Sequence, residues 1–195
     1  MLTLFLALKL SAPVPTPTNW LKVDDYPMQY VKAGRTFDVD LRTTVRANGT
    51  AQECSIEKSS GEPEFDKYNC GLLLRRLKFK PATDAAGKPV VGVFRNRVAW
   101  TLDNRKMKPR TGDIEVTVAK LPAGLKFPTL IDVAVSVDSA GKPSDCSSGK
   151  PDQNAALLKI ACAQLVQTYR ATPARLSGGE AVPSVQNAIV SFVNR

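Results

Sequence analysis

Four cysteines are the residues of this chain whose type and spacing say most about chemistry. They are Cys54, Cys70, Cys146 and Cys162, and the first two and the last two each lie sixteen residues apart. Neither pair has the CxxC spacing of a redox-active dithiol or a zinc knuckle. The spacing instead predicts structural disulfides. Four buried free thiols in a cytoplasmic protein are the alternative.

The other residue types argue against catalysis. The chain has no histidine, which removes Ser-His and Cys-His nucleophile activation and histidine-ligated metal sites. Its carboxylates are spaced like surface or helix-capping residues, no nucleophile has an evident base, and no glycine-rich loop would cradle phosphate. We therefore predict a protein that is not an enzyme and that holds neither a metal nor a cofactor.

The sequence repeats itself at an interval of 92 residues. A shift of this length places the first cysteine pair on the second. It also aligns glycines, prolines and apolar residues, namely Val45 with Val137, Gly49 with Gly141, Leu73 with Leu165, Pro81 with Pro173, Gly87 with Gly179, Val98 with Val190 and Trp100 with Phe192. We interpret the chain as two copies of one domain. Of the three possible connectivities, the repeat favours Cys54–Cys70 and Cys146–Cys162.

Each copy shows the same order of expected elements. Alternating apolar and polar residues predict strands at 37–46 and 131–138, and each is followed by a turn and a second strand that carries a cysteine. Asn48-Gly49 suits a tight hairpin turn in which both central residues have positive φ. A helix follows in each copy. Third strands are expected at Gly92–Leu102 and Ser184–Val193.

The helices have recognisable starts and apolar faces. Pro63 suits the first position of one helix, and Asp152 or Asn154 is expected to cap the other. The core residues predicted on the helices and third strands are Phe65, Cys70, Leu73, Leu77, Val98, Trp100, Leu157, Leu158, Ala161, Cys162, Leu165, Tyr169, Val190 and Phe192.

The predicted fold class is α+β, with each copy a small antiparallel three-stranded sheet (strand, strand, helix, strand) packed on its helix. We expect a signal segment and proline-rich linker at 1–19, a first domain at 20–102, a linker at 103–112 and a second domain at 113–195. Units of this size have thin cores. A disulfide that closes a loop of this length contributes about 3 kcal/mol in the chain-entropy model.

The N-terminus has the apolar run of a signal peptide, although Lys9 interrupts it and no basic residue precedes it. Removal near Ala12 is the preferred interpretation, with a short docking strand or a mis-assigned start as alternatives. Residues 11–18 are expected to form an extended linker that packs against nothing. No stretch reaches the ~20 apolar residues of a membrane-spanning helix.

A series of short motifs in the first copy resembles a known family. The series runs in order through Tyr26-Pro27, the hairpin at 45–49, Cys54, Ser59-Ser60-Gly61, Cys70, the basic-aromatic run at 75–82, Gly87-Lys88-Pro89 and Val98-Ala99-Trp100. This series is similar to the C-terminal domain of TonB-type energy transducers, in the variants that carry a cysteine pair. The resemblance covers about Tyr26 to Leu102, and the second copy is a more diverged form.

The resemblance implies a periplasmic domain that binds an N-terminal segment of a TonB-dependent outer-membrane receptor by strand addition. A transducer also needs a membrane helix and a long proline-rich stalk, whereas this chain has only the short apolar run and a short proline-containing segment. The resemblance therefore implies the fold more than the energy-coupling role. An extended peptide or another envelope protein is the expected partner.

The third strand of the first copy is the expected binding edge, through Val93, Arg95, Arg97 and Ala99. Its two arginines would discourage indiscriminate pairing and attract an acidic peptide, or would only keep the edge soluble. A proline at Arg95 or Asn96 is expected to abolish peptide binding.

The net charge of +9 is dispersed and no nucleic-acid motif is present, so nucleic acid is not the expected partner. Attachment to lipid or peptidoglycan through the basic clusters stays open. The alternative function is structural self-association, because the last strand of the second copy carries Val185, Ile189 and Val193 opposite Val190 and Phe192. A strand that is apolar on both faces is typically covered.

Overall fold

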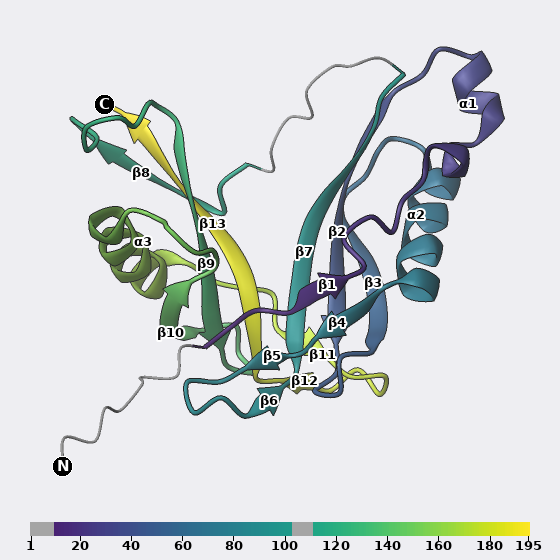
Figure 1. Ribbon diagram of the computed structural model, residues 1–195. Helices are drawn as coiled ribbons and strands as arrows, with labels where there is room; N and C mark the ends of the chain where they lie inside the picture. The colour runs from purple at the N-terminus through teal and green to yellow at the C-terminus, as the bar shows by residue number, and fades with distance from the viewer. Residues whose placement is uncertain (1–9, 103–110) are drawn as a thin grey trace.

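The computed structural model describes residues 10–102 and 111–195. These residues form one seven-stranded mixed sheet that opens into a V, with α2 (Pro63–Arg76) on the outer side of one arm and α3 (Ala155–Thr168) on the outer side of the other (Figure 1). The sheet order is β10-β9-β13-β7-β2-β3, and β8 also pairs with β13. The strands of this sheet are β2 (Phe37–Val45), β3 (Ala51–Lys58), β7 (Gly92–Trp100), β8 (Ile114–Val118), β9 (Thr129–Val137), β10 (Pro143–Ser148) and β13 (Ser184–Asn194).

Short elements surround the sheet and connect its strands. They are β1 (Val14–Thr16), the 3-10 helix η1 (Val23–Asp25), α1 (Met28–Lys32), β4 (Lys78–Lys80), β5 (Ala82–Thr83), β6 (Pro89–Val90), β11 (Ala174–Arg175) and β12 (Ala181–Val182). β5 pairs with β6, and β11 pairs with β12, so each half carries a small hairpin just before its last strand.

The two halves contain the same order of main elements. β2, β3, α2 and β7 make the first half, and β9, β10, α3 and β13 make the second. Pro63 begins α2 as expected, and Asn154 caps α3 by accepting the N–H groups of Ala156 and Leu157. The predicted core residues of the third strands, including Trp100 and Phe192, are buried. Local patterning therefore predicted the α+β elements of each half.

The hairpin turns differ from the expected geometry. Gly49 has a φ of +83°, whereas Asn48 does not have a positive φ, so the expectation for Asn48 was wrong. The N–H of Gly49 donates to the carbonyl oxygen of Arg46, which makes a three-residue loop with glycine in the left-handed position. A Cβ on Gly49 would lie 2.1 Å from the carbonyl oxygen of Phe79. Gly141 is held in the same way, with φ +84° and Ala171 in the place of Phe79.

Both predicted disulfides are present. Cys54 of β3 is bonded to Cys70 of α2, and Cys146 of β10 is bonded to Cys162 of α3. The Cα–Cα distance is 5.5 Å in each. Each bond ties the second strand of a half to the inner face of its helix, which excludes the alternative of four free thiols.

The halves do not form separate three-stranded sheets, in contrast to the expectation. β13 pairs with β7 in parallel, with Val185 opposite Gly92 and Gln186 opposite Val93. Neighbouring residues in a ladder point to the same face. Val93 therefore shares a face with Gln186, on the side that α3 covers in the second half. Of the predicted linker at 103–112, residues 103–110 lie outside the described residues.

The proline-rich N-terminal segment packs against both halves, in contrast to the unpacked linker that its composition predicts. β1 pairs with β4, and the N–H of Ser11 donates to the carbonyl oxygen of Thr83 at 3.0 Å. Leu10 is only 5% exposed and forms a small apolar cluster with Ala82 of the first half and with Ala134 and Val185 of the second. The segment thus helps to join the halves.

We expect the substitution Leu10→Ala to lower the free energy of unfolding by about 2–4 kcal/mol, because it empties a buried site that bridges the two halves. Val14→Ala in the same segment is the matched control, since Val14 is 51% exposed and its loss should change stability by less than about 0.5 kcal/mol. Equilibrium urea denaturation of the oxidised protein measures both values. Equal effects of the two substitutions would show that Leu10 does not join the halves.

Candidate functional site

The outer edge of β7, on the side away from β2, begins at the junction between the halves. Val93 pairs there with Gln186 of β13. Two residues further on, the side chain of Asn187 takes the place of a strand. Its Oδ1 accepts the N–H of Arg95 at 2.7 Å, and its Nδ2 donates to the carbonyl oxygen of Arg95 at 2.8 Å. The second half therefore satisfies the outer backbone groups of β7 as far as Arg95.

Beyond Arg95 the two strands separate, and β13 curves away from β7 (Figure 1). Successive residues of a strand direct their N–H groups to alternate edges, so Arg97 and Ala99 direct theirs to the same edge as Arg95. Within residues 10–102 and 111–195, no strand pairs with this edge of β7 after Val93. The predicted edge residues thus share one edge, with Ala99 in the part that β13 has left.

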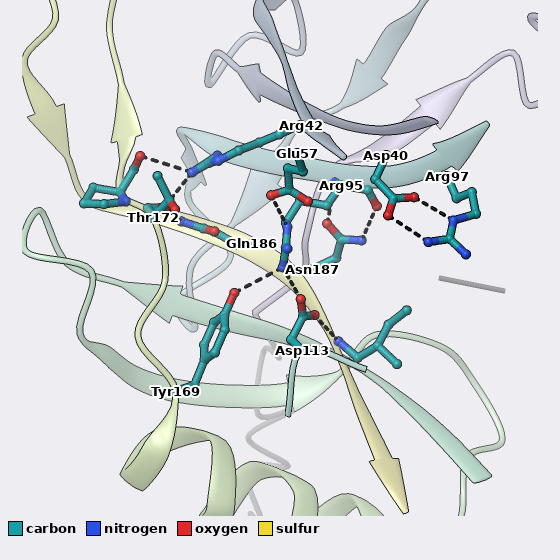
Figure 2. Close-up of polar contacts among 12 residues, drawn as sticks. Asp40, Arg42, Glu57, Arg95, Arg97, Asp113, Tyr169, Thr172, Gln186 and Asn187 are labelled. Atoms are coloured by element: carbon teal, nitrogen blue, oxygen red, sulfur yellow. Dashed lines mark hydrogen bonds and ion pairs between the residues drawn. The ribbon is translucent and has the colours of Figure 1, made fainter. Parts of the chain in front are cut away.

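Arg95 is the centre of an ion-pair cluster at the fork where β7 and β13 separate (Figure 2). Its Nε donates to Glu57 of β3 at 2.6 Å, and its Nη1 donates to Asp113 at 2.5 Å and to the hydroxyl of Tyr169 at 3.1 Å. Its side chain is 15% exposed, and that of Asp113 is 7% exposed. The guanidinium therefore links the first half to the start of β8 and the end of α3.

The acidic partners also shift the pKa of Arg95. Burial alone would lower its pKa, but the hydrogen bond to Glu57 and the charge of Asp113 outweigh that effect and raise it. Arg97 is paired within the first half, where its Nε and Nη2 donate to the two carboxylate oxygens of Asp40 at 2.7 and 2.8 Å. This bidentate hydrogen bond raises the pKa of Arg97. The two arginines expected to attract an acidic peptide thus have carboxylate partners within the chain.

Sequence reasoning missed Asp113, Asn187 and Glu57, and it named Tyr169 only as a core residue. Asp113 is placed by β13, because its N–H donates to the carbonyl oxygen of Ile189 at 2.7 Å and its Oδ2 accepts the N–H of Ile189 at 2.8 Å. A signal for part of this site existed in the sequence. The 92-residue shift places Arg95 on Asn187, and residues 114–118 alternate between apolar and polar side chains, as a strand does.

A polar cavity of about 250 Å³ adjoins the cluster. Arg42 of β2 lines it and donates to the carbonyl oxygens of Thr172 at 2.5 Å and Pro173 at 3.1 Å, and burial lowers the pKa of Arg42. The carboxylates of this cavity are Glu57 and Asp113, which the guanidinium of Arg95 already engages. The arrangement fastens the halves together through charged hydrogen bonds.

Two general features of the described residues bear on the remaining expectations. In residues 10–102 and 111–195, no three or more histidine, cysteine, aspartate and glutamate side chains gather as a metal site would require. In the same part of the chain, none of the helices is both long enough and apolar enough to pass through a membrane.

Comparison with known proteins yields one match. Residues 23–102 match the model of the family described as the Gram-negative bacterial TonB protein C-terminal. The matched segment runs from η1 to just beyond β7, so it contains the first half of the sheet and its outer edge. No curated protein and no solved structure matches the chain. The match agrees with the resemblance found over Tyr26–Leu102, and it supports a non-catalytic, protein-binding role.

We expect Asn187→Ala to lower the free energy of unfolding by about 1–3 kcal/mol, because it leaves the partly buried N–H and C=O of Arg95 without their partner. Hydrogen exchange at the amide of Arg95 should accelerate in parallel. Asn194→Ala is the matched control, since Asn194 lies at the exposed end of the same strand and its side-chain oxygen accepts the N–H of the neighbouring Arg195. Unchanged exchange at Arg95 in the Asn187→Ala variant would contradict the role given to the Asn187 amide.

Proposed function

We propose that this chain is a periplasmic protein-binding module that accepts an extended peptide by strand addition at the outer edge of β7. The observation that carries the proposal is the separation of β13 from β7 after Val93, which leaves Ala99 on an edge that no described strand covers. An edge of this kind offers backbone N–H and C=O groups to an incoming strand. The match of residues 23–102 to the TonB C-terminal family supports the same role.

The disulfides support an oxidising compartment. Disulfides form and persist in the periplasm and in other secreted settings, whereas the cytosol keeps most thiols reduced. Both bonds of this chain join a strand to a helix and so contribute to the stability of small cores. The proposed partner is the N-terminal segment of a TonB-dependent outer-membrane receptor or another extended segment of an envelope protein.

We also propose that the second half is a diverged copy of the matched domain. The elements follow in the same order, and both disulfides have a sequence separation of 16. The carbonyl oxygens of Gly49 and Gly141 accept the N–H groups of Phe79 and Ala171, each at 2.9 Å, and these residues correspond under the 92-residue shift. Equal contacts at equal intervals are a property of repeated units.

A second candidate function is self-association, and the junction between the halves favours it. β7 and β13 already pair within one chain, which shows that the last strands of the two halves fit each other. A second molecule could offer the same strands to the outer edge of β7. Sedimentation at several concentrations separates the two functions, since a monomer that binds peptide supports the first.

The substitution Ala99→Pro tests the proposed edge. It removes an N–H group that the alternation along β7 directs to the outer edge, so peptide affinity should fall at least tenfold. Ala99→Ser keeps that N–H and is the control. Arg95, which was expected to suit this test, does not, because its N–H is held by Asn187.

The measurement is an NMR titration of the oxidised protein with synthetic peptides from the N-termini of TonB-dependent receptors. Amide shifts concentrated in Gly92–Leu102, and lost in the folded Ala99→Pro variant alone, are the expected result. A flat titration of the wild-type protein, or undiminished binding by the Ala99→Pro variant, would overturn strand addition at this edge.

A further inference from the structure

The chain itself occupies the corresponding edge of the second half. β7 pairs with β13 at residues 185–186, and β8 pairs with it in parallel from Val190 to Asn194. Between these two ladders, Asp113 bonds both backbone groups of Ile189. Strand β8 thus pairs with β13 in the position that an added peptide would take on an acceptor edge.

Strand β8 fits this position through its side chains as well as its backbone. Ile114, Val116 and Val118 pack against the core of the second half, whereas Glu115 and Thr117 are exposed. Just before β8 the backbone lies close to β13, because a Cβ on Gly112 would lie 2.7 Å from the Cβ of Ser191. β8 therefore seals the outer edge of β13 with an alternating pattern, apolar inward and polar outward.

The first half has no such strand among its described residues. The 92-residue shift places the β8-covered part of β13 on residues 98–102, and it places β8 itself on residues 22–26. Three of those five residues form η1 rather than a strand. Tyr26 is buried, with its ring centroid 5.1 Å from that of Trp100. In the first half this segment therefore contributes Tyr26 to the core, and it does not cover the edge of β7 as a strand.

We propose that β8 is an intramolecular occupant that closes the acceptor edge of the second half, so that each chain binds one partner strand, at β7 and not at β13. This proposal rests on the proposed function, and it assigns that function to a single edge. The β13 edge can still accept a strand once β8 is displaced. Backbone hydrogen bonds and a few apolar side chains hold β8, and an incoming strand would make contacts of the same kind.

Covalent attachment explains why an external peptide does not displace β8. A segment of the same chain competes at an effective concentration that is typically on the order of millimolar. A partner peptide at micromolar concentration would bind β13 only if its intrinsic affinity were far higher than that of β8. Asp113 adds to the advantage of β8, because its ion pair with Arg95 fastens the start of the strand to the first half.

The experiment opens the β13 edge through substitutions at exposed positions of β8. Asp113 directs its N–H to β13, so Glu115 and Thr117, which follow at alternate positions, direct theirs to β13 as well. The double variant E115P/T117P removes these two N–H groups from the ladder. Its matched control is E115A/T117A, which removes the same exposed side chains and keeps the N–H groups. Gly112→Val, which obstructs the approach of β8 to Ser191, is an independent way to open the edge.

The probe is a synthetic peptide with the sequence of residues 112–119, titrated into each full-length oxidised protein and followed by amide NMR. In the wild-type protein and the alanine control, we expect no shifts in Val190–Asn194. In the folded proline variant we expect saturable shifts there, as the peptide replaces the displaced β8. Shifts at Val190–Asn194 in the wild-type protein, or their absence at millimolar peptide in both folded opened variants, would overturn the proposal.

The proposed function is tested separately in the same proteins. Receptor-derived peptides should bind the wild-type protein with a stoichiometry of one, and their shifts should lie in β7. Absence of that binding, together with trans binding of the 112–119 peptide to the opened variant, would overturn the receptor role and leave β8 as the occupant of its edge. Two receptor peptides bound per wild-type chain would overturn the single-edge assignment.

Discussion

Backbone hydrogen bonding along the last strand of each half is the constraint on which the rest of this structure depends. An N–H or C=O group removed from water must find a partner. The backbone groups of β13 cannot all hydrogen-bond to water, because Val185 is buried on one face of the strand and Val190 and Phe192 are buried on the other. It therefore takes β9 on its inner edge and β7, Asp113 and β8 in turn on its outer edge. The V shape follows, since β7 and β8 share one edge of the same strand and β7 must leave before β8 begins.

The junction makes two thin cores depend on each other. Arg95 binds Glu57 of the first half and Asp113 of the second, so one guanidinium bridges two carboxylates and offsets their repulsion across the fork. Surface ion pairs contribute little to stability, but breaking a largely buried pair leaves an uncompensated charge. Arg42 adds charged hydrogen bonds to the carbonyls of Thr172 and Pro173, and Leu10 adds an apolar contact on the other side of the sheet. The disulfides stabilise each half separately, whereas these contacts fix how the halves meet.

Sequence patterns predicted the parts of the fold that depend on neighbours along the chain. The alternation in β2 and β9, the apolar faces of α2 and α3, the cap at Asn154 and the disulfide pairing are all such features. The junction was not predictable in this way, because it depends on which edges meet in space. Proline-rich composition correctly gave residues 14–16 an extended backbone, but it carried no information on the site that Ala134 and Val185 form for Leu10. The apolar residues on both faces of β13 indicated a buried strand. They did not show that β7 and β8 pair with its outer edge.

The difference between Arg95 and Asn187, which meet at the centre of the junction, explains why the halves can join. Positions 95 and 187 correspond under the 92-residue shift, and in the structure the side chain at 187 bonds the backbone at 95. An arginine at 187 would offer only donors, so it could not accept the N–H of Arg95, and it would place a second positive charge beside the first. The amide of Asn187 is neutral, and it supplies one acceptor and one donor, which is what an unpaired strand residue requires. The difference between Arg95 and Asn187 thus lets the second half close part of the β7 edge, while the side chain of Arg95 binds Asp113 at the start of β8.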